Sequence, residues 1–229
     1  MAAAAAAAAA TAPILLLRAP SIYPPHDDDD GGDGKGKGKG KGSRSPWRAP
    51  PLAWLERTWS VTHSTLPMWA KARNVRITYK LLSSPSPPSS GAGAGGRTLI
   101  DDEVCSEPLE SGWVTAVMQP RCIRGVDTPV PGLEGGWRWR GRGWLRVASS
   151  HWEILGWGES DLDGVHEKWV VTWFKASLFT PMGVDVYSDR KEGISEGLYG
   201  KIREALEGGL AGTEVAELCK GMFAVEIKY

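Results

Sequence analysis

The sequence lacks the short motifs on which many nucleotide- and metal-dependent enzymes depend. Its 229 residues contain no P-loop, no GxGxxG ahead of a predicted helix and no HExxH. The spacing of His63, His151 and His166 does not suit a metal site. We therefore expect neither a metal ion nor a cofactor. Basic and acidic side chains number 27 each, so the net charge is zero and we expect no specific nucleic-acid partner.

Cysteine is scarce, and its spacing indicates no metal-binding or redox motif. Cys105, Cys122 and Cys219 form no CxxC pair, and three cysteines cannot all pair within one chain. This pattern suits a reducing compartment, so we expect a cytoplasmic protein. A single bridge from Cys105 or Cys122 to Cys219 would be compatible with secretion instead.

Long apolar runs are also missing. The alanine run 2–10 and the apolar piece 13–17 lack the positive region that precedes the apolar part of a signal peptide. They are neither long nor apolar enough to predict a membrane span. No acidic residue precedes Asp27, which leaves a transit peptide open.

The composition of residues 1–50 predicts a disordered low-complexity tail. Ordering such a segment costs roughly 1 to 2 kcal/mol per residue, and it has little apolar surface to offset that cost. The alternating Gly and Lys of residues 34–42 could attract RNA or DNA weakly. No aromatic side chains are interleaved with these lysines, which favours a flexible spacer. Residues 51–229 remain as one domain and hold all the tryptophans except Trp47.

Extended segments dominate residues 137–190. Between residues 137 and 147, apolar residues and glycines share one parity, and arginines occupy the other. This alternation is typical of a half-buried strand. Further extended segments follow at residues 150–157, 168–174 and 184–187.

The rest of the domain adds strands before this region and a helix after it. Alternation predicts strands at residues 59–63 and 75–79, and extended pieces at 98–105 and 112–121. Residues 83–96 and 125–136 are predicted loops because they are rich in glycine and proline. Ile194, Leu198, Ile202 and Leu206 have helical spacing, and a short final strand is predicted at 223–227. We expect an all-β fold: an antiparallel up-and-down barrel of about eight strands with a C-terminal α-helix.

Three clusters in this order resemble the motifs of a lipocalin, a member of the calycin superfamily, and in particular the lipocalin-like proteins of filamentous fungi. Residues 55–59 stand where the family has Gly-x-Trp, with Arg57 in place of the glycine. Residues 150–174 are similar to the sixth and seventh strands of the family and their acidic turn. Residues 186–190 resemble the motif at the end of its eighth strand.

The resemblance assigns a structural role to two residues. In the family, an arginine after the eighth strand packs over the tryptophan of the first strand, which implies that Arg190 covers Trp59 at the closed end of the barrel. Such a cation over an aromatic face contributes about 0.5 to 2 kcal/mol. Asp189 is an extra residue in the motif.

The resemblance also implies a cavity for a small, mostly apolar molecule such as a fatty acid, in a monomer or weak homo-oligomer. Strand parity proposes Tyr79, Trp139, Trp173 and either His151 or Trp152 as lining residues. The alternative is that these aromatic residues fill a packed core or coat the outer wall.

A polar set could give this container an enzymatic role. His151 and Glu153 share one strand face, which the resemblance points inward, and Asp185 would then also face inward. A histidine and two carboxylates around one cavity could act as general acid and base in an isomerase, dehydratase or cyclase of secondary metabolism. We favour the simpler interpretation, in which these groups orient a ligand and the protein is not an enzyme.

Overall fold

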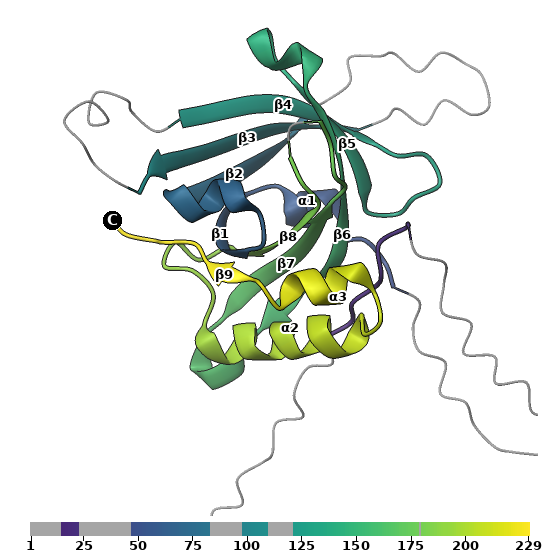
Figure 1. Cartoon of the computed structure of the whole chain (residues 1–229). Coiled ribbons are helices and arrows are strands. Elements are labelled where there is room, and N and C mark those ends of the chain that lie inside the picture. The colour runs from purple at the N-terminus through teal and green to yellow at the C-terminus, as the bar shows by residue number, and fades with distance from the viewer. Residues whose placement is uncertain (1–14, 23–46, 83–97, 110–120, 179) are drawn as a thin grey trace, which may run out of the picture.

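The computed structural model describes residues 15–22, 47–82, 98–109, 121–178 and 180–229, and these form a barrel with the two C-terminal helices on one side (Figure 1). The strands are β1 (Thr58–Ser64), β2 (Ala72–Leu82), β3 (Leu99–Pro108), β4 (Arg121–Pro129), β5 (Gly136–Gly141), β6 (Ser149–Ser160), β7 (Glu167–Phe174), β8 (Gly183–Ser188) and β9 (Phe223–Ala224). The α-helices are α1 (Leu52–Leu55), α2 (Glu196–Gly209) and α3 (Glu214–Cys219).

The sheet closes because β1 pairs with both β2 and β8. Each of β2 to β7 pairs antiparallel with the next strand along the chain, and β1 joins the two ends of this series. The short strand β9 adds to one end of β1. The predicted eight-stranded antiparallel barrel with a C-terminal helix is confirmed.

The strand boundaries differ from the predictions in three places. The strand predicted over residues 137–147 ends at Gly141, and a 3-10 helix (Gly143–Val147) follows it. The final strand covers only Phe223–Ala224 of the predicted 223–227. Residues 121–129 form β4, so the loop predicted for 125–136 begins only after Pro129. Gly125 contributed to the prediction of a loop, but it lies within β4. This position is a glycine because the indole of Trp139 leaves no room for a side chain. The predicted loop 83–96 and nearly all of the extended piece 112–121 lie outside the described residues.

Apolar side chains fill part of the barrel interior. The period of two sends alternate residues of each strand inward, and the buried interior residues pack as one cluster. Its largest members are Trp59, Trp69, Trp137, Trp152, Tyr79 and Tyr187.

A second apolar core lies between the outer wall of the barrel and the C-terminal helices. Helix α2 begins after Ser195, whose hydroxyl accepts a hydrogen bond from the Leu198 backbone and caps the first turn. Its residues Leu198, Ile202 and Leu206 are fully buried in the cluster that also holds the outward residues of β7 and β8. In Figure 1, α2 and α3 lie together on this side of the barrel.

The prediction of a tail without contacts to the domain is wrong for residues 15–22 and 47–50. Leu15 and Leu17 pack against the second core, and Trp47 packs against the first. The backbone N–H of Arg18 donates to the Leu155 carbonyl at 2.9 Å. Composition hid this contact, since the few apolar residues of the segment meet a complementary surface on β6. Residues 1–14 and 23–46 lie outside the described residues.

Candidate functional site

The barrel contains a cavity of about 140 Å³. Its described lining is predominantly apolar and aromatic, with two carboxylic acids and a few hydroxyl groups. The lining residues are Leu66, Met68, Trp69, Ile77, Tyr79, Asp102, Val104, Ile123, Trp139, Ser150, Trp152, Phe174, Thr180, Asp185 and Tyr187. An apolar hollow with a few polar groups is typical of a small-molecule site.

Aromatic rings from different strands form one wall of this cavity. The ring of Tyr79, on β2, stacks on that of Trp152, on β6, with centroids 5.7 Å apart. Trp137, which is not a lining residue, also stacks on Trp152, with centroids 6.0 Å apart. Trp139 lies against Gly125, where an added Cβ atom would come within 2.2 Å of its indole. The position of Trp139 therefore depends on a glycine in the neighbouring strand.

Two carboxyl groups from neighbouring strands form a buried pair. Asp102 of β3 lies opposite Gly125, and Asp127 follows two residues later on the same face of β4. Burial and the repulsion of Asp127 raise the pKa of Asp102 well above its usual range. Burial also raises the pKa of Asp127 to about 7, against the opposing hydrogen bond from the Trp152 indole at 2.8 Å.

A third carboxyl group, Asp185 of β8, has partners for both of its oxygens. The Ser64 hydroxyl donates to Oδ1 at 2.5 Å, and the Trp69 indole donates to Oδ2 at 3.2 Å. Burial raises the pKa of Asp185 to about 7, and these two hydrogen bonds oppose that shift. A carboxylic acid with such a pKa can donate or accept a proton at neutral pH.

Of the six residues predicted to bind ligand, three line the cavity. Tyr79, Trp139 and Asp185 do so. Of the two alternatives on β6, the inward residue is Trp152, so the prediction that His151 and Glu153 face the cavity is wrong. Sequence reasoning missed Asp102, although it shares its parity with Ile100 and Val104.

Trp173 and Glu153 lie on the outer wall of the barrel. Trp173 belongs to the core beneath the C-terminal helices. Glu153 is fully buried beneath the N-terminal segment, where its carboxylate accepts hydrogen bonds from the Arg18 guanidinium at 2.7 Å and the Ser21 backbone at 3.0 Å. His151 Nε2 lies 3.1 Å from the same carboxylate. Parity misplaced these residues because additional chain covers the outside of the barrel here.

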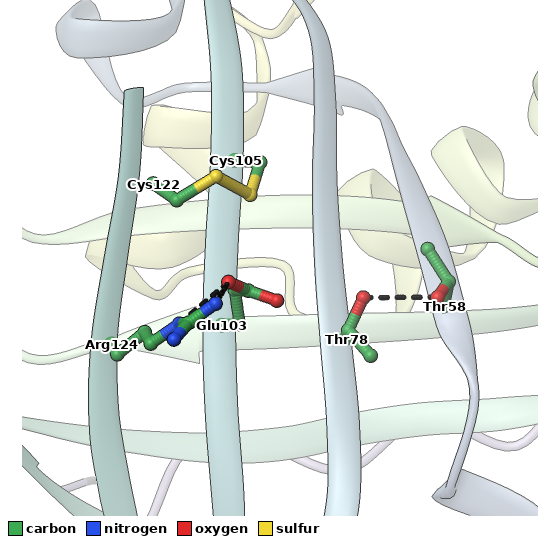
Figure 2. The surroundings of a disulfide bond; sticks show 6 residues. All are labelled: Thr58, Thr78, Glu103, Cys105, Cys122 and Arg124. Carbon is green, nitrogen blue, oxygen red and sulfur yellow. Dashed lines mark hydrogen bonds and ion pairs between the residues drawn. A yellow bond between two sulfur atoms is a disulfide. The ribbon is translucent and has the colours of Figure 1, made fainter. Parts of the chain in front are cut away.

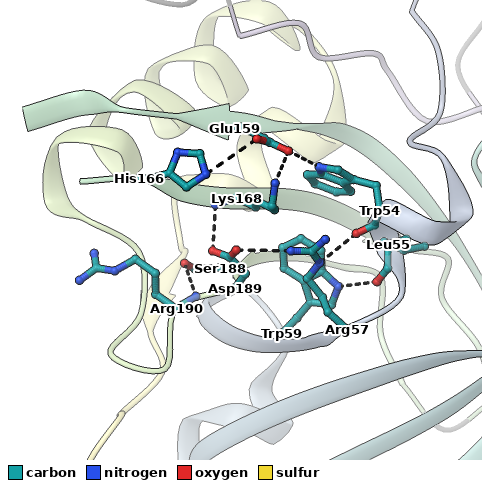
Figure 3. A network of polar contacts seen from close by, with 10 residues as sticks. All are labelled: Trp54, Leu55, Arg57, Trp59, Glu159, His166, Lys168, Ser188, Asp189 and Arg190. Carbon is teal, nitrogen blue, oxygen red and sulfur yellow. Dashed lines mark hydrogen bonds and ion pairs between the residues drawn. The ribbon is translucent and has the colours of Figure 1, made fainter. Parts of the chain in front are cut away.

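The cation over Trp59 is Arg57 rather than Arg190. The Arg57 guanidinium carbon lies 5.3 Å from the Trp59 ring centroid, and a guanidinium nitrogen lies 3.5 Å from Asp189. The Arg190 side chain instead lies 3.7 Å from the Glu167 carboxylate and points away from Trp59 (Figure 3). The residue that replaces the family's glycine thus supplies the cation, and the extra Asp189 holds it.

A network of polar contacts surrounds this end of β1 (Figure 3). The Trp59 indole donates to the Leu55 carbonyl at 3.0 Å. Glu159 accepts from the Trp54 indole at 2.6 Å and forms an ion pair with Lys168. These contacts tie α1 to β1 and β6, and β6 to β7.

A disulfide joins Cys105 of β3 to Cys122 of β4, which lie opposite each other in the register (Figure 2). Cys219 is free and buried. The pairing therefore differs from both bridges that the sequence left open. Among the described residues, one group has the proximity of metal ligands, Glu103 with Cys105 and Cys122. The disulfide occupies both sulfur atoms, so this group does not fit a metal.

The site is a mostly apolar cavity inside an eight-stranded antiparallel barrel. No protein-family model matches the chain. The chain is 27% identical over 168 residues to "Botcinic acid biosynthesis cluster B protein 12" of Botryotinia fuckeliana (strain B05.10), covering 70% of this chain and 67% of that protein.

Two solved structures overlap with this fold at low sequence identity. Apocrustacyanin C1 has a TM-score of 0.45 and 10% identity, covering 76% of this chain and 78% of the other. The siderocalin Ex-FABP has a TM-score of 0.41 and 13% identity, covering 76% and 95%. Over the part of the chain that is described, no helix has the length and apolar character needed to cross a membrane.

Proposed function

We propose that the protein binds a small, mostly apolar molecule inside its barrel. The observation that carries this proposal is the mostly apolar cavity inside the barrel, which Tyr79, Trp139 and Trp152 line. Apolar walls provide the affinity, and a few carboxyl and hydroxyl groups orient the ligand. We therefore favour a ligand-binding barrel over a purely structural barrel with a filled interior.

A bromo-octanol probe with a terminal bromine tests this function, because bromine quenches indole fluorescence on contact. Burying eight methylenes contributes roughly 6 kcal/mol, so a Kd of about 10 to 100 µM is expected. Quenching that saturates in this range supports the proposal. Quenching that rises linearly with concentration contradicts it.

A matched pair of variants on β6 locates the probe. Ser150 lines the cavity, whereas its neighbour Ser149 is exposed. Ser150→Trp should fill the cavity and weaken probe binding at least tenfold, while Ser149→Trp should bind like the unchanged protein. Equal binding by both variants would place the probe elsewhere.

One observation favours an enzymatic role as a second candidate. Asp185 lines the cavity and has a pKa raised to about 7 by burial, which suits a general acid or base. The relative from a biosynthesis cluster agrees with such a role in secondary metabolism. If the protein is an enzyme, Asp185→Asn should lower the turnover of a host metabolite about a hundredfold. The Kd for bromo-octanol should stay within threefold of that of the unchanged protein. Equal turnover by this variant would exclude Asp185 as the catalytic group.

A further inference from the structure

The ionisable groups in the cavity wall are acidic or phenolic. Among the described lining residues, Asp102 and Asp185 are carboxylic acids, and none is lysine, arginine or histidine. Asp127, the neighbour of Asp102, adds a third buried acid. A ligand carboxylate would therefore enter without a cation to pair with, and it would meet groups that can carry the same charge.

Two of these acids also have oxygens without hydrogen-bond partners. Asp102 is 6% exposed and Asp127 is fully buried. Within the described part of the chain, neither Asp102 Oδ1 nor Asp127 Oδ2 meets a donor. Both oxygens of Asp185, in contrast, accept hydrogen bonds from the protein. Buried acceptors are satisfied in most proteins, so the unpartnered pair indicates a donor that binds here.

The polar group that fits this pair is a cation with several donors. An ammonium group carries a positive charge and three N–H donors and has no acceptor. It can donate to Asp102 and Asp127 together, whereas an alcohol has a single donor and a carboxylate has none. Asp102 lines the cavity, and Asp127 lies beside it on the same face of the adjacent strand, so a group bound to Asp102 lies next to both acids.

We propose that the cavity selects apolar molecules that carry a primary amine, with Asp102 and Asp127 as the anchor for the ammonium group. This inference rests on the proposed binding function and names the class of ligand. It also differs from the expectation of a fatty-acid ligand, which the family resemblance implied. The aromatic walls hold the hydrocarbon part, and the acid pair distinguishes one head group from another.

Three probes of equal chain length test the selectivity. Octylamine, octanol and octanoate differ only in the head group, and each is measured by displacement of bromo-octanol at pH 7 and by direct calorimetry. Octylamine should bind roughly 10- to 100-fold more tightly than octanol, the ratio expected for a charge-assisted hydrogen bond, and octanoate should bind most weakly.

Neighbouring aspartates provide matched variants. Asp101 precedes Asp102 but pairs with Arg142 at 2.8 Å. Asp102→Asn and Asp127→Asn should each reduce the preference for octylamine over octanol to about threefold or less, and Asp101→Asn should retain it. If a variant fails to fold, the three probes on the unchanged protein still test the proposal.

The outcomes separate this inference from the proposed function. Saturable binding of octanol with equal or weaker binding of octylamine would overturn the amine selectivity and leave the container intact. A preference for octylamine that persists in both Asp102→Asn and Asp127→Asn would overturn the assignment of the anchor. If none of the three probes binds, the proposed function itself fails.

Discussion

Removing the Arg18 side chain should destabilise the protein although this residue lies in a segment of low complexity. Its guanidinium lies 2.7 Å from Glu153, and the exposed fractions of the two side chains are 16% and 0%. Loss of one partner from a fully buried ion pair costs about 3 to 5 kcal/mol. Arg18 is partly exposed, and Ser21 and His151 still contact the carboxylate, so we expect about 2 to 3 kcal/mol for Arg18→Ala.

Urea unfolding followed by tryptophan fluorescence measures this change directly. The control is Arg203→Ala, which breaks an exposed pair with Glu207 and should leave the free energy of unfolding unchanged within error. Deletion of residues 1–22 should cost at least as much as Arg18→Ala, because it also removes the packing of Leu17. A loss below about 0.5 kcal/mol for Arg18→Ala would show that the segment does not hold the buried carboxylate.

Three further predictions concern the cavity, the disulfide and the buried acids. Gly125→Ala should displace Trp139, cost about 1 to 3 kcal/mol in urea unfolding and weaken bromo-octanol binding; unchanged binding would contradict this packing. Alkylation of the unfolded, unreduced protein should label Cys219 alone, and mass spectrometry showing three labels would contradict the disulfide. Folding raises the pKa values of Asp127 and Asp185 to about 7, so the folded state binds more protons than the unfolded state between about pH 4 and pH 7. The contribution of these acids to the free energy of unfolding should therefore decrease as the pH rises through this range. Urea titrations across this range should show a shallower decrease in Asp185→Asn, and an identical slope would contradict the shift.

Alternation of polarity predicted the barrel because most strands have one buried face. Tyr79 and Trp139 were assigned inward correctly for this reason. On β6 and β7 both faces are buried, since the helices and the N-terminal segment cover the outside. Parity alone then could not distinguish His151 from Trp152 as the inward residue.

Contacts between distant segments could not be read from local patterns. The pairing of Arg18 with Glu153 joins positions 135 residues apart. The position of Arg57 over Trp59 depends on its ion pair with Asp189. Asp189 is distant from Arg57 in the sequence, so no local pattern predicts this contact. Strand parity could have identified Asp102 as an inward residue. Its neighbour Asp127 could not be identified in this way, because it lay in a stretch predicted as a loop.

The most direct test of the central claim is a crystal structure of the protein with bromo-octanol, in which anomalous scattering locates the bromine. We predict the bromine and the alkyl chain inside the barrel, in contact with Tyr79, Trp139 or Trp152. A probe bound only in the outer groove near His151, Val147 and Leu178 would contradict the account. An interior closed around its own side chains, without the probe, would contradict it equally.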